Sequence, residues 1–206
     1  MFLVMRIHIA CWIFLGSFFG PDANSQNIDI DLLRSINPQQ PNSKFWQGAT
    51  DSYLWVSGGA TLGTLAVGLI KNDKELRYKA YETIIAIGID VVVTDVLKAA
   101  FNRKRPVDEY PNDIYALTVS NGHSFPSGHT SLAFATATSL TLTYKKWYVA
   151  APAYLWASCV GYSRMYLGKH FPSDVFAGAV IGAGSSYLSH WLSKKLFRSR
   201  AIQKNL

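Results

Sequence analysis

The chain has 206 residues, of which 49% are hydrophobic, 14% aromatic and 16% charged, and this composition excludes both a disordered chain and a typical soluble enzyme. The formal net charge is +7, but no basic run is interleaved with aromatic residues, so nucleic acid is not expected as a partner. The length is sufficient for one domain with a hydrophobic core.

Residues 1–25 have the pattern of an export signal. Arg6 is the only firm charge before the apolar run IACWIFLGSFFG, and Ala23-x-Ser25 offers a cleavage site with small residues. An uncleaved membrane anchor fits the same segment, and in either case the chain enters or crosses a membrane. The following segment, 26–50, is polar, and we expect a loop or a surface-lying segment that faces outward.

The rest of the chain predicts an all-α, membrane-embedded helical bundle of five spans, or six if the N-terminal segment is uncleaved. The apolar stretches are near the lower length limit for membrane spans, so a soluble enzyme with buried helices is the alternative. Small residues recur in them, as expected where helices pack closely in lipid. The bundle domain is 51–196, and a basic cytoplasmic tail follows at 197–206. The predicted spans are 53–70, 79–98, 129–143, 148–163 and 174–193.

The distribution of lysine and arginine predicts the orientation of the bundle. Basic residues gather in the connectors 71–79 and 145–146 and in the tail from Lys194, which alternating spans place on one side. By the positive-inside rule this side is cytoplasmic. The opposite loops then face the periplasm from a bacterial-type inner membrane. Asp90 and Asp95 interrupt the second stretch, which indicates that it faces the bundle interior.

The outward segment HSFPSGHTS, residues 123–131, is typical of a turn that leads into a helix. Ser127 is a plausible helix cap, and the first turn of a helix offers unpaired N–H groups that suit an anion. His129 would then be placed at this anion site, in a position to move a proton. His123 is interpreted as an ordinary loop residue, and a capped helix with an incidental histidine is the simpler alternative.

Cations flank the outward end of the second apolar stretch. Lys98 and Arg105 are seven residues apart, so they share one face if the helix continues to Pro106. An isolated pair of this kind also fits interfacial anchors that extend their charges to the membrane surface. We expect the neighbouring Arg103 and Lys104 to be solvated charges.

The outward loop SRMYLGKHFPSD contains Arg164, His170 and Asp174. Pro172 predicts a helix start, which places His170 just ahead of the positive end of that helix. The simpler alternatives are an ion pair of Arg164 with a loop carboxylate and a structural hydrogen bond between His170 and Asp174. We expect Lys169 to be a solvated charge.

Three segments together closely resemble the signature of the type-2 phosphatidic-acid phosphatase family. Its superfamily also includes bacterial class A acid phosphatases and vanadium haloperoxidases. All signature positions occur in order with their internal spacings intact, and the resemblance covers about residues 50–195. The segments are Lys98-x6-Arg105-Pro106, Pro126-Ser127-Gly128-His129 and Ser163-Arg164-x5-His170-x3-Asp174.

Phosphoryl transfer spreads negative charge over three equatorial oxygens, so fixed cations and N–H donors are its main requirement. The resemblance implies that His170 attacks phosphorus, that Asp174 fixes its tautomer, and that His129 protonates the leaving oxygen and later activates water. It implies neither a metal nor another cofactor. The implied phosphate-binding residues are Lys98, Arg105, Ser127, Gly128 and Arg164.

The sequence therefore predicts a phosphatase that acts on a lipid phosphate or lipid pyrophosphate reached by lateral diffusion. Candidate substrates are undecaprenyl pyrophosphate, phosphatidylglycerol phosphate, phosphatidic acid and the phosphates of lipid A, and no residue chooses between them. The alternatives are a soluble periplasmic acid phosphatase, a vanadium haloperoxidase, a non-catalytic lipid-phosphate binder and metal-assisted hydrolysis. In the last case His129, His170 and Asp174 would be the metal ligands. The pattern does not predict an oligomeric state.

Overall fold

The computed structural model describes residues 23–118 and 121–203, and in these ranges every regular element is a helix. The predicted all-α class is confirmed. The predicted export signal or anchor falls almost entirely on 1–22, outside the described residues, as do the last three residues of the predicted tail. The helices are α2 (Ala23–Ile36), α3 (Lys44–Ile70), α4 (Lys74–Phe101), α5 (Pro106–Glu109), α6 (Gly128–Tyr144), α7 (Trp147–Tyr166) and α8 (Pro172–Gln203).

Each predicted apolar stretch lies within one long helix, but the prediction of a loop for 26–50 is wrong over most of its length. Residues 23–36 form α2, and α3 already begins at Lys44. The reason is an apolar pair three residues apart: Ile30 and Leu33 are both buried, on the face of α2 that packs against Ile114 and Phe171. The segment therefore lies on the surface, as the alternative expectation had it, and does so as an amphipathic helix.

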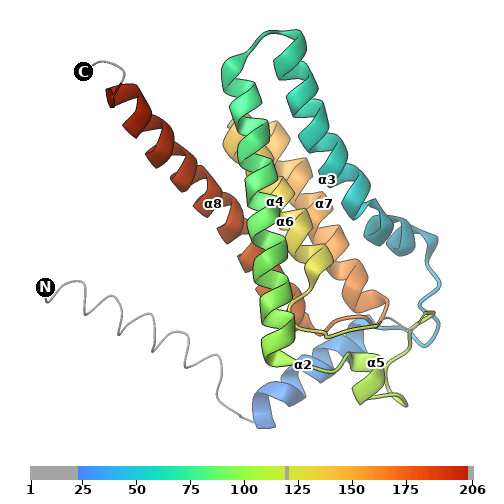
Figure 1. Cartoon of the computed structure of the whole chain (residues 1–206). Helices are drawn as coiled ribbons and strands as arrows, with labels where there is room; N and C mark the ends of the chain where they lie inside the picture. Colours follow the sequence, from blue (N-terminus) through green and yellow to red (C-terminus); the bar gives the residue numbers. More distant parts are fainter. Residues whose placement is uncertain (1–22, 119–120, 204–206) are drawn as a thin grey trace, which may run out of the picture.

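Helix α6 is the central element of the bundle and contacts α3, α4, α7 and α8 (Figure 1). It presents small buried side chains such as Ala133 and Ala137, which let its neighbours approach closely. The closest approach is that of α8: a Cβ atom added at Gly178 would lie 2.6 Å from the Ser127 carbonyl oxygen, and one at Gly182 would overlap the carbonyl of Ser131. This crossing holds the beginning of α8 against the beginning of α6.

The glycines of α3 differ in their packing. A Cβ atom added at Gly58, Gly59 or Gly63 would meet no other residue within 4 Å, whereas one added at Gly68 would lie 2.9 Å from the main-chain nitrogen of Arg77 on α4. The expectation of close helix packing at small residues is therefore met at Gly178 and Gly182 of α8 and at Gly68 of α3, and not at the other three positions of α3.

The outer surface of the bundle is apolar, whereas its interior contains many hydroxyl groups. Helix α4 buries Ala86, Asp90 and Thr94 and exposes Val92 and Val96, which is the reverse of a helix in a water-soluble domain. Among the described helices, α3 is the one whose length and continuous apolar composition are sufficient to cross a membrane. The number of five spans stays a prediction.

The two aspartates predicted to face the interior behave differently. Asp90 is 1% exposed and accepts a hydrogen bond from the hydroxyl of Ser131 on α6, as expected for an ionisable group inside a helical bundle. Asp95 is exposed, so the prediction is wrong for this residue. Five positions separate the two residues, and this spacing places them on different faces of α4.

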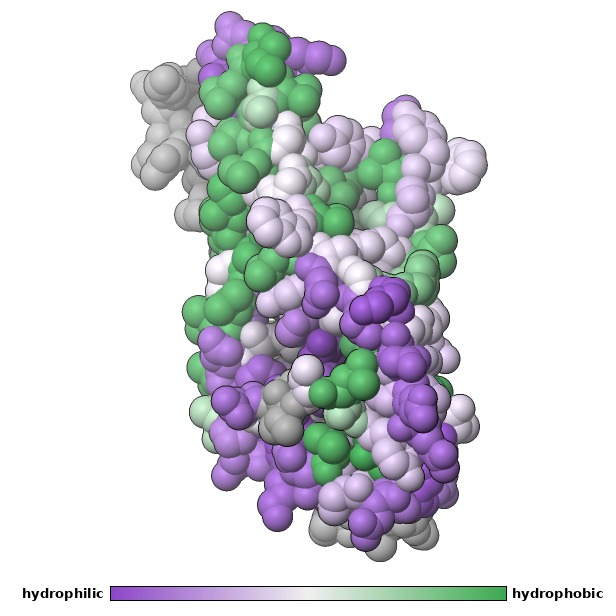
Figure 2. All heavy atoms as spheres, turned by 90° about the vertical axis from the view of Figure 1, so that its right-hand side faces the viewer, coloured by the Kyte–Doolittle hydropathy of each residue, from purple (hydrophilic) through white to green (hydrophobic). Residues whose placement is uncertain are grey.

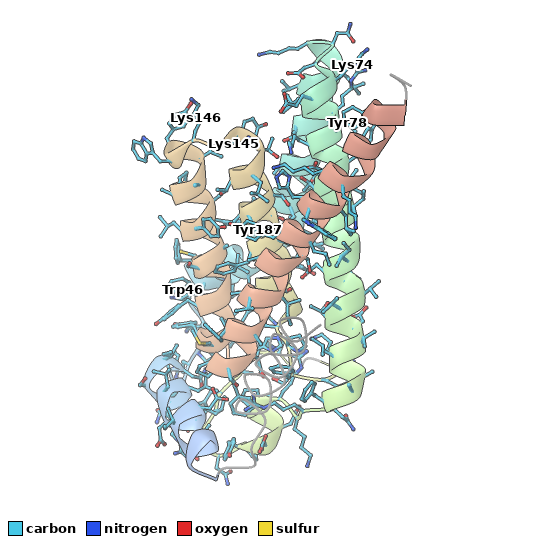
Figure 3. The ribbon with its side chains drawn as sticks, turned by 90° about the vertical axis from the view of Figure 1, so that its left-hand side faces the viewer. Trp46, Lys74, Tyr78, Lys145, Lys146 and Tyr187 are labelled. Atoms are coloured by element: carbon cyan, nitrogen blue, oxygen red, sulfur yellow. The ribbon has the colours of Figure 1, made fainter. Side chains whose placement is uncertain are left out.

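The bundle has two distinct ends. Lys74, Lys145 and Lys146 lie at the end where α3 turns into α4 and α6 into α7 (Figure 3). The described residues between α4 and α6 (102–118, which include α5, and 121–127) and the connection 167–171 lie at the other end, next to α2 (Figure 1). In Figure 2 hydrophilic side chains cover this second end, while hydrophobic ones cover much of the helical surface above it. All predicted site residues therefore come from, or border, the same end of the molecule.

Candidate active site

The connection after α4 bends sharply and brings two cations to one place. The helix ends at Phe101, and Asn102 adopts the left-handed conformation (φ 46°), so the condition that the helix continues to Pro106 is not met. Lys98 remains in the last turn of α4 and donates a hydrogen bond to the carbonyl of Pro126. Arg105 returns to the bundle as the residue that precedes α5.

The guanidinium of Arg105 is buried and reaches the ring of His170. Its Nη1 donates to the carbonyl of Lys169 at 3.0 Å and lies 3.5 Å from His170 Nε2, while its Nε donates to the carbonyl of Gly122 at 3.1 Å. Burial lowers the pKa of Arg105, and the carboxylates of Asp108 and Asp174 partly offset this effect. The side chain is a fixed cation beside the imidazole.

The other nitrogen of His170 faces Asp174, one helical turn further along the chain. Nδ1 lies 3.6 Å from Asp174 Oδ2, and both side chains are at most 2% exposed. The same oxygen accepts a hydrogen bond from the hydroxyl of Ser124 (2.5 Å) and from the N–H of Phe171 (2.9 Å). These hydrogen bonds fix the carboxylate of Asp174 in an orientation in which Oδ2 faces the imidazole.

The surroundings of His170 favour its neutral form. Burial lowers the pKa of the imidazole to about 4; Asp174 opposes this shift, while the nearby charges of Arg164 and Arg105 add to it. At neutral pH the ring is therefore uncharged and carries a single N–H. With Nδ1 directed at a carboxylate, Nε2 is the nitrogen that is able to act as a nucleophile.

Arg164 extends from the last turn of α7 into the same region. It is 6% exposed, and its Nη1 donates to the hydroxyl of Thr50 on α3 at 2.8 Å. Its Nε is buried and has no hydrogen-bond partner. A buried guanidinium N–H without an acceptor is unfavourable, and an anion oxygen would provide the missing partner.

The beginning of α6 completes the arrangement. Ser127 is the N-cap residue as predicted, but its hydroxyl bonds to the Thr130 hydroxyl (2.9 Å) instead of to a main-chain N–H. Its own N–H donates to the main-chain carbonyl of Asp174 at 3.0 Å, which joins α6 to α8. A Cβ atom added at Gly128 would meet Lys98 Cε at 4.0 Å, so this position opens toward that cation.

His129 lies in the first turn of α6 and is held by an aromatic ring. The Tyr53 ring of α3 stacks on the imidazole, with 3.8 Å between the centroids and 30° between the planes. Stacking of this kind restricts the orientation of the imidazole without using either ring nitrogen.

Two cations that were expected to be solvated belong to the buried network, so those expectations are wrong. Arg103 donates to Asp174 Oδ1 at 2.8 Å, and although burial lowers its pKa, the carboxylates of Asp174 and Asp29 outweigh that effect and raise it. Lys169 is 5% exposed and donates to the Thr118 hydroxyl at 2.8 Å. Burial, together with the charges of Arg164 and Arg105, lowers the pKa of Lys169 to about 8.

Several residues that contact the predicted site residues could not be identified from the sequence. Arg103 is two residues from Arg105, so its proximity was the one available signal for it. Thr50 and Tyr53 are more than seventy positions from the residues they contact, and no spacing rule connects them. Lys98 and Arg105 also reach the site. They do so from two different segments and not from one helix face.

Several known proteins resemble this chain in sequence. The model of the PAP2 superfamily matches residues 80–198. A lipid A 4'-phosphatase of Bacteroides thetaiotaomicron is 30% identical over 182 residues, which cover 82% of this chain and 79% of the relative. An undecaprenyl-diphosphatase of Sulfolobus acidocaldarius is 28% identical over 195 residues, covering 92% of this chain and 86% of the relative.

Two crystal structures have a similar fold. That of Aquifex aeolicus LpxE has a TM-score of 0.63 at 33% identity, covering 79% of this chain and 94% of that chain. That of a transmembrane PAP2 type phosphatidylglycerolphosphate phosphatase from Bacillus subtilis has a TM-score of 0.67 at 23% identity, covering 94% of both chains.

Proposed function

The chain belongs to the PAP2 superfamily, and from this premise we propose that it is a membrane phosphatase that removes phosphate from a lipid phosphate or lipid pyrophosphate through a phosphohistidine intermediate. One observation supports the proposal most strongly. The neutral His170 has Arg105 at one ring nitrogen and Asp174 at the other. A nucleophile, a cation and an orienting carboxylate are thus combined in one buried place.

Binding of the phosphate is assigned to cations from three segments and to the beginning of α6. Arg105 and Arg164 contribute guanidinium groups, and the unpaired Nε of Arg164 offers a donor that has no other use in the fold. Lys98 adds a third positive charge beside Gly128. The first N–H groups of α6, after Ser127, complete the set of donors for the equatorial oxygens.

The chemistry proceeds in two displacements. Nε2 of His170 attacks phosphorus, a P–N bond forms and the P–O bond to the lipid breaks, while His129 gives a proton to the leaving oxygen. His129 then takes a proton from water, the resulting hydroxide attacks phosphorus, and the P–N bond breaks to release phosphate. Asp174 keeps the proton of His170 on Nδ1 and stabilises the positive ring during the transfer, as in other carboxylate–histidine pairs.

The metal-assisted alternative has less support from the geometry. In the ranges 23–118 and 121–203, no three His, Cys, Asp or Glu side chains form a group suited to a metal ion. Asp174 already accepts hydrogen bonds at both oxygens, from Arg103 and from Ser124. A divalent ion at this place would also be repelled by Arg105 and Arg164.

A lipid is the proposed substrate because the site lies at the end of a bundle with an apolar outer surface, and in a membrane such an end would meet the lipid head groups. The names of the relatives, lipid A 4'-phosphatase and undecaprenyl-diphosphatase, support this class and include both a phosphomonoester and a pyrophosphate. We further propose that the site faces the periplasm, since the connectors rich in lysine lie at the other end of the bundle.

The test is a phosphate-release assay on the purified protein in detergent. The panel contains undecaprenyl pyrophosphate, phosphatidylglycerol phosphate, phosphatidic acid and lipid A, each with and without a chelator. We expect release from at least one lipid, no effect of the chelator, inhibition by vanadate and no turnover by His170→Ala. Activity that is lost on chelation would favour metal-assisted hydrolysis, and binding of every lipid without release would indicate a non-catalytic protein.

A further inference from the structure

Helix α2 contributes one carboxylate to the network around Asp174. Asp29 Oδ2 lies 2.8 Å from Arg103 Nη2, and the Asp29 side chain is only 11% exposed. The same carboxylate accepts hydrogen bonds from the N–H (2.9 Å) and the hydroxyl (2.5 Å) of Ser173, in the first turn of α8. Asp29 therefore contacts both the arginine beside Asp174 and the first turn of α8, which contains Asp174.

Arg103 connects Asp29 with Asp174 at the site. Its Nη1 donates to Asp174 Oδ1 at 2.8 Å and to the Ser173 hydroxyl at 2.7 Å, and its guanidinium lies 3.9 Å from the centre of the Phe171 ring. Oδ2 of Asp174 is the oxygen that faces His170. The chain of contacts thus runs from Asp29 through Arg103 to one carboxylate oxygen and leaves the other for the imidazole.

The position of Asp29 is fixed by apolar packing. Ile30 and Leu33, on the same helix, are buried against Ile114 and Phe171, and Phe171 also lies under Arg103. Arginine side chains have high rotamer entropy, so an arginine at a helix end needs partners on several sides to stay in one geometry. Asp29 and the Phe171 ring provide these partners for Arg103.

The charge of Asp29 also matters for Asp174. An unopposed arginine at 2.8 Å would neutralise much of the negative charge that Asp174 presents to His170. With a carboxylate on each side, the Arg103 cation is shared between Asp29 and Asp174. The carboxylate of Asp174 then keeps more of its ability to stabilise the positive ring that forms during phosphoryl transfer.

We propose that Asp29 is a positioning residue for the phosphoryl transfer, acting through Arg103 to hold Asp174 in the orientation and charge state that His170 requires. This inference rests on the proposed phosphatase function. It assigns a role in the reaction to α2, a helix outside the residues 80–198 matched by the superfamily model.

The experiment compares Asp29→Asn with Asp31→Asn in the full-length protein. Asp31 is the matched control, because it lies on the same helix and pairs with an arginine, Arg34, at 2.8 Å, but is 65% exposed. Asn at position 29 retains an oxygen for the N–H of Ser173 and loses the charge that faces Arg103. We expect kcat to fall about 10-fold or more in Asp29→Asn, by analogy with outer-shell partners of functional histidines. Asp31→Asn should match the wild type.

Two readouts separate positioning from a merely structural effect. KM should change little, within about threefold, because the phosphate-binding cations do not contact Asp29. In an Arg103→Gln background, Asp29→Asn should have almost no further effect, less than about twofold, because the residue through which Asp29 acts is already absent. A loss that arose only from weaker contacts of position 29 with Ser173 at the start of α8 would by contrast appear in either background.

The outcomes are distinguishable from failure of the proposed function. A wild type that releases phosphate, combined with an unchanged kcat in Asp29→Asn or an equal loss in both backgrounds, overturns the role of Asp29 alone. A wild type that releases no phosphate from any lipid of the panel overturns the proposed function and with it this role.

If Asp29→Asn does not accumulate, Asp29→Glu is the second variant. It keeps the charge and should retain about a third of the wild-type kcat or more. If Asp29→Glu folds like the wild type but loses as much kcat as Arg103→Gln does, the role of Asp29 is contradicted.

Discussion

Each nitrogen of the His170 ring has a partner of a different charge. Nδ1 faces the carboxylate of Asp174, and Nε2 lies beside the guanidinium of Arg105. Because burial lowers the pKa of the ring to about 4, the free enzyme has a neutral imidazole over the whole physiological range. A bound phosphate would neutralise the surrounding cations, and the same ring would then be able to become positive during the transfer.

His129 is expected to act as the general acid, and its variant has a distinctive kinetic pattern. His129→Ala should lower kcat by about 10²–10⁴-fold for a lipid phosphate, whose alkoxide leaving group needs a proton. The loss should be much smaller for an aryl phosphate such as p-nitrophenyl phosphate, whose leaving group departs unprotonated. Steady-state kinetics with both substrates measure the difference.

The control for this experiment is His123→Ala in the same segment, which should leave both rates unchanged. Equal losses of His129→Ala on the lipid and aryl substrates would contradict the assignment of His129 as the proton donor. The stacked Tyr53 ring would in that case be the reason to examine a structural role of the imidazole.

At the residue scale the sequence indicated the side chains that are proposed to act on the phosphate, but it did not indicate the side chains that hold them in position. Lys98, Arg105 and His170 occur at recognisable spacings, because the chemistry requires those residue types at fixed intervals. Asp29 and Thr50 act through tertiary contacts, 74 and 114 positions from Arg103 and Arg164, and such contacts have no local pattern. Arg103 was misjudged because exposure is the usual state of an arginine in a basic run.

The crossing of α8 over α6 is the element-scale feature that builds the site. Gly178 and Gly182 let the two helices approach until Ser127 donates to the main chain of Asp174 at 3.0 Å. The turn that precedes α6 and the carboxylate of Asp174 therefore come together because of two glycines one helical turn apart. A larger residue at either position would separate the two halves of the site.

Two glycines in α8 offer a matched comparison of this feature. Gly182→Ala would place a Cβ atom against the carbonyl of Ser131, whereas Gly184→Ala would meet nothing within 4 Å. We expect Gly182→Ala to cost about 1–3 kcal/mol of stability through overpacking and to lower kcat. Gly184→Ala should be neutral or slightly stabilising, because alanine favours a helix by about 1 kcal/mol over glycine. Thermal unfolding in detergent and phosphate release measure both. Similar behaviour of the two variants would show that the crossing tolerates a wider spacing.

At this scale hydrophobic patterning located the long helices and failed at their ends. The apolar stretches identified α3, α4, α6, α7 and α8, since a continuous apolar run is visible in any part of a chain. The end of α4 at Phe101 and the helix α2 were missed. The first depends on a left-handed Asn102, and the second on burial of Ile30 and Leu33 by residues distant in sequence.

The whole molecule is a bundle with an apolar outside, a polar end that contains the site, and a basic opposite end. We propose its orientation in the membrane from the charge distribution alone. In a variant without its native cysteines, Lys104→Cys should react with a membrane-impermeant maleimide from the periplasmic side. Lys145→Cys, in the connector at the other end, should react only after permeabilisation. The reverse pattern would place the site on the cytoplasmic face.

The central claim is that His170 carries the phosphate during turnover, and trapping of the intermediate tests it most directly. The protein is mixed with a ³²P-labelled lipid phosphate, quenched within milliseconds in alkali, and digested for identification of the labelled residue. The account predicts label on His170 that is stable in alkali and lost in acid, and no label in His170→Ala. Phosphate release by the wild type without any labelled protein, or with the label on another residue, would contradict it.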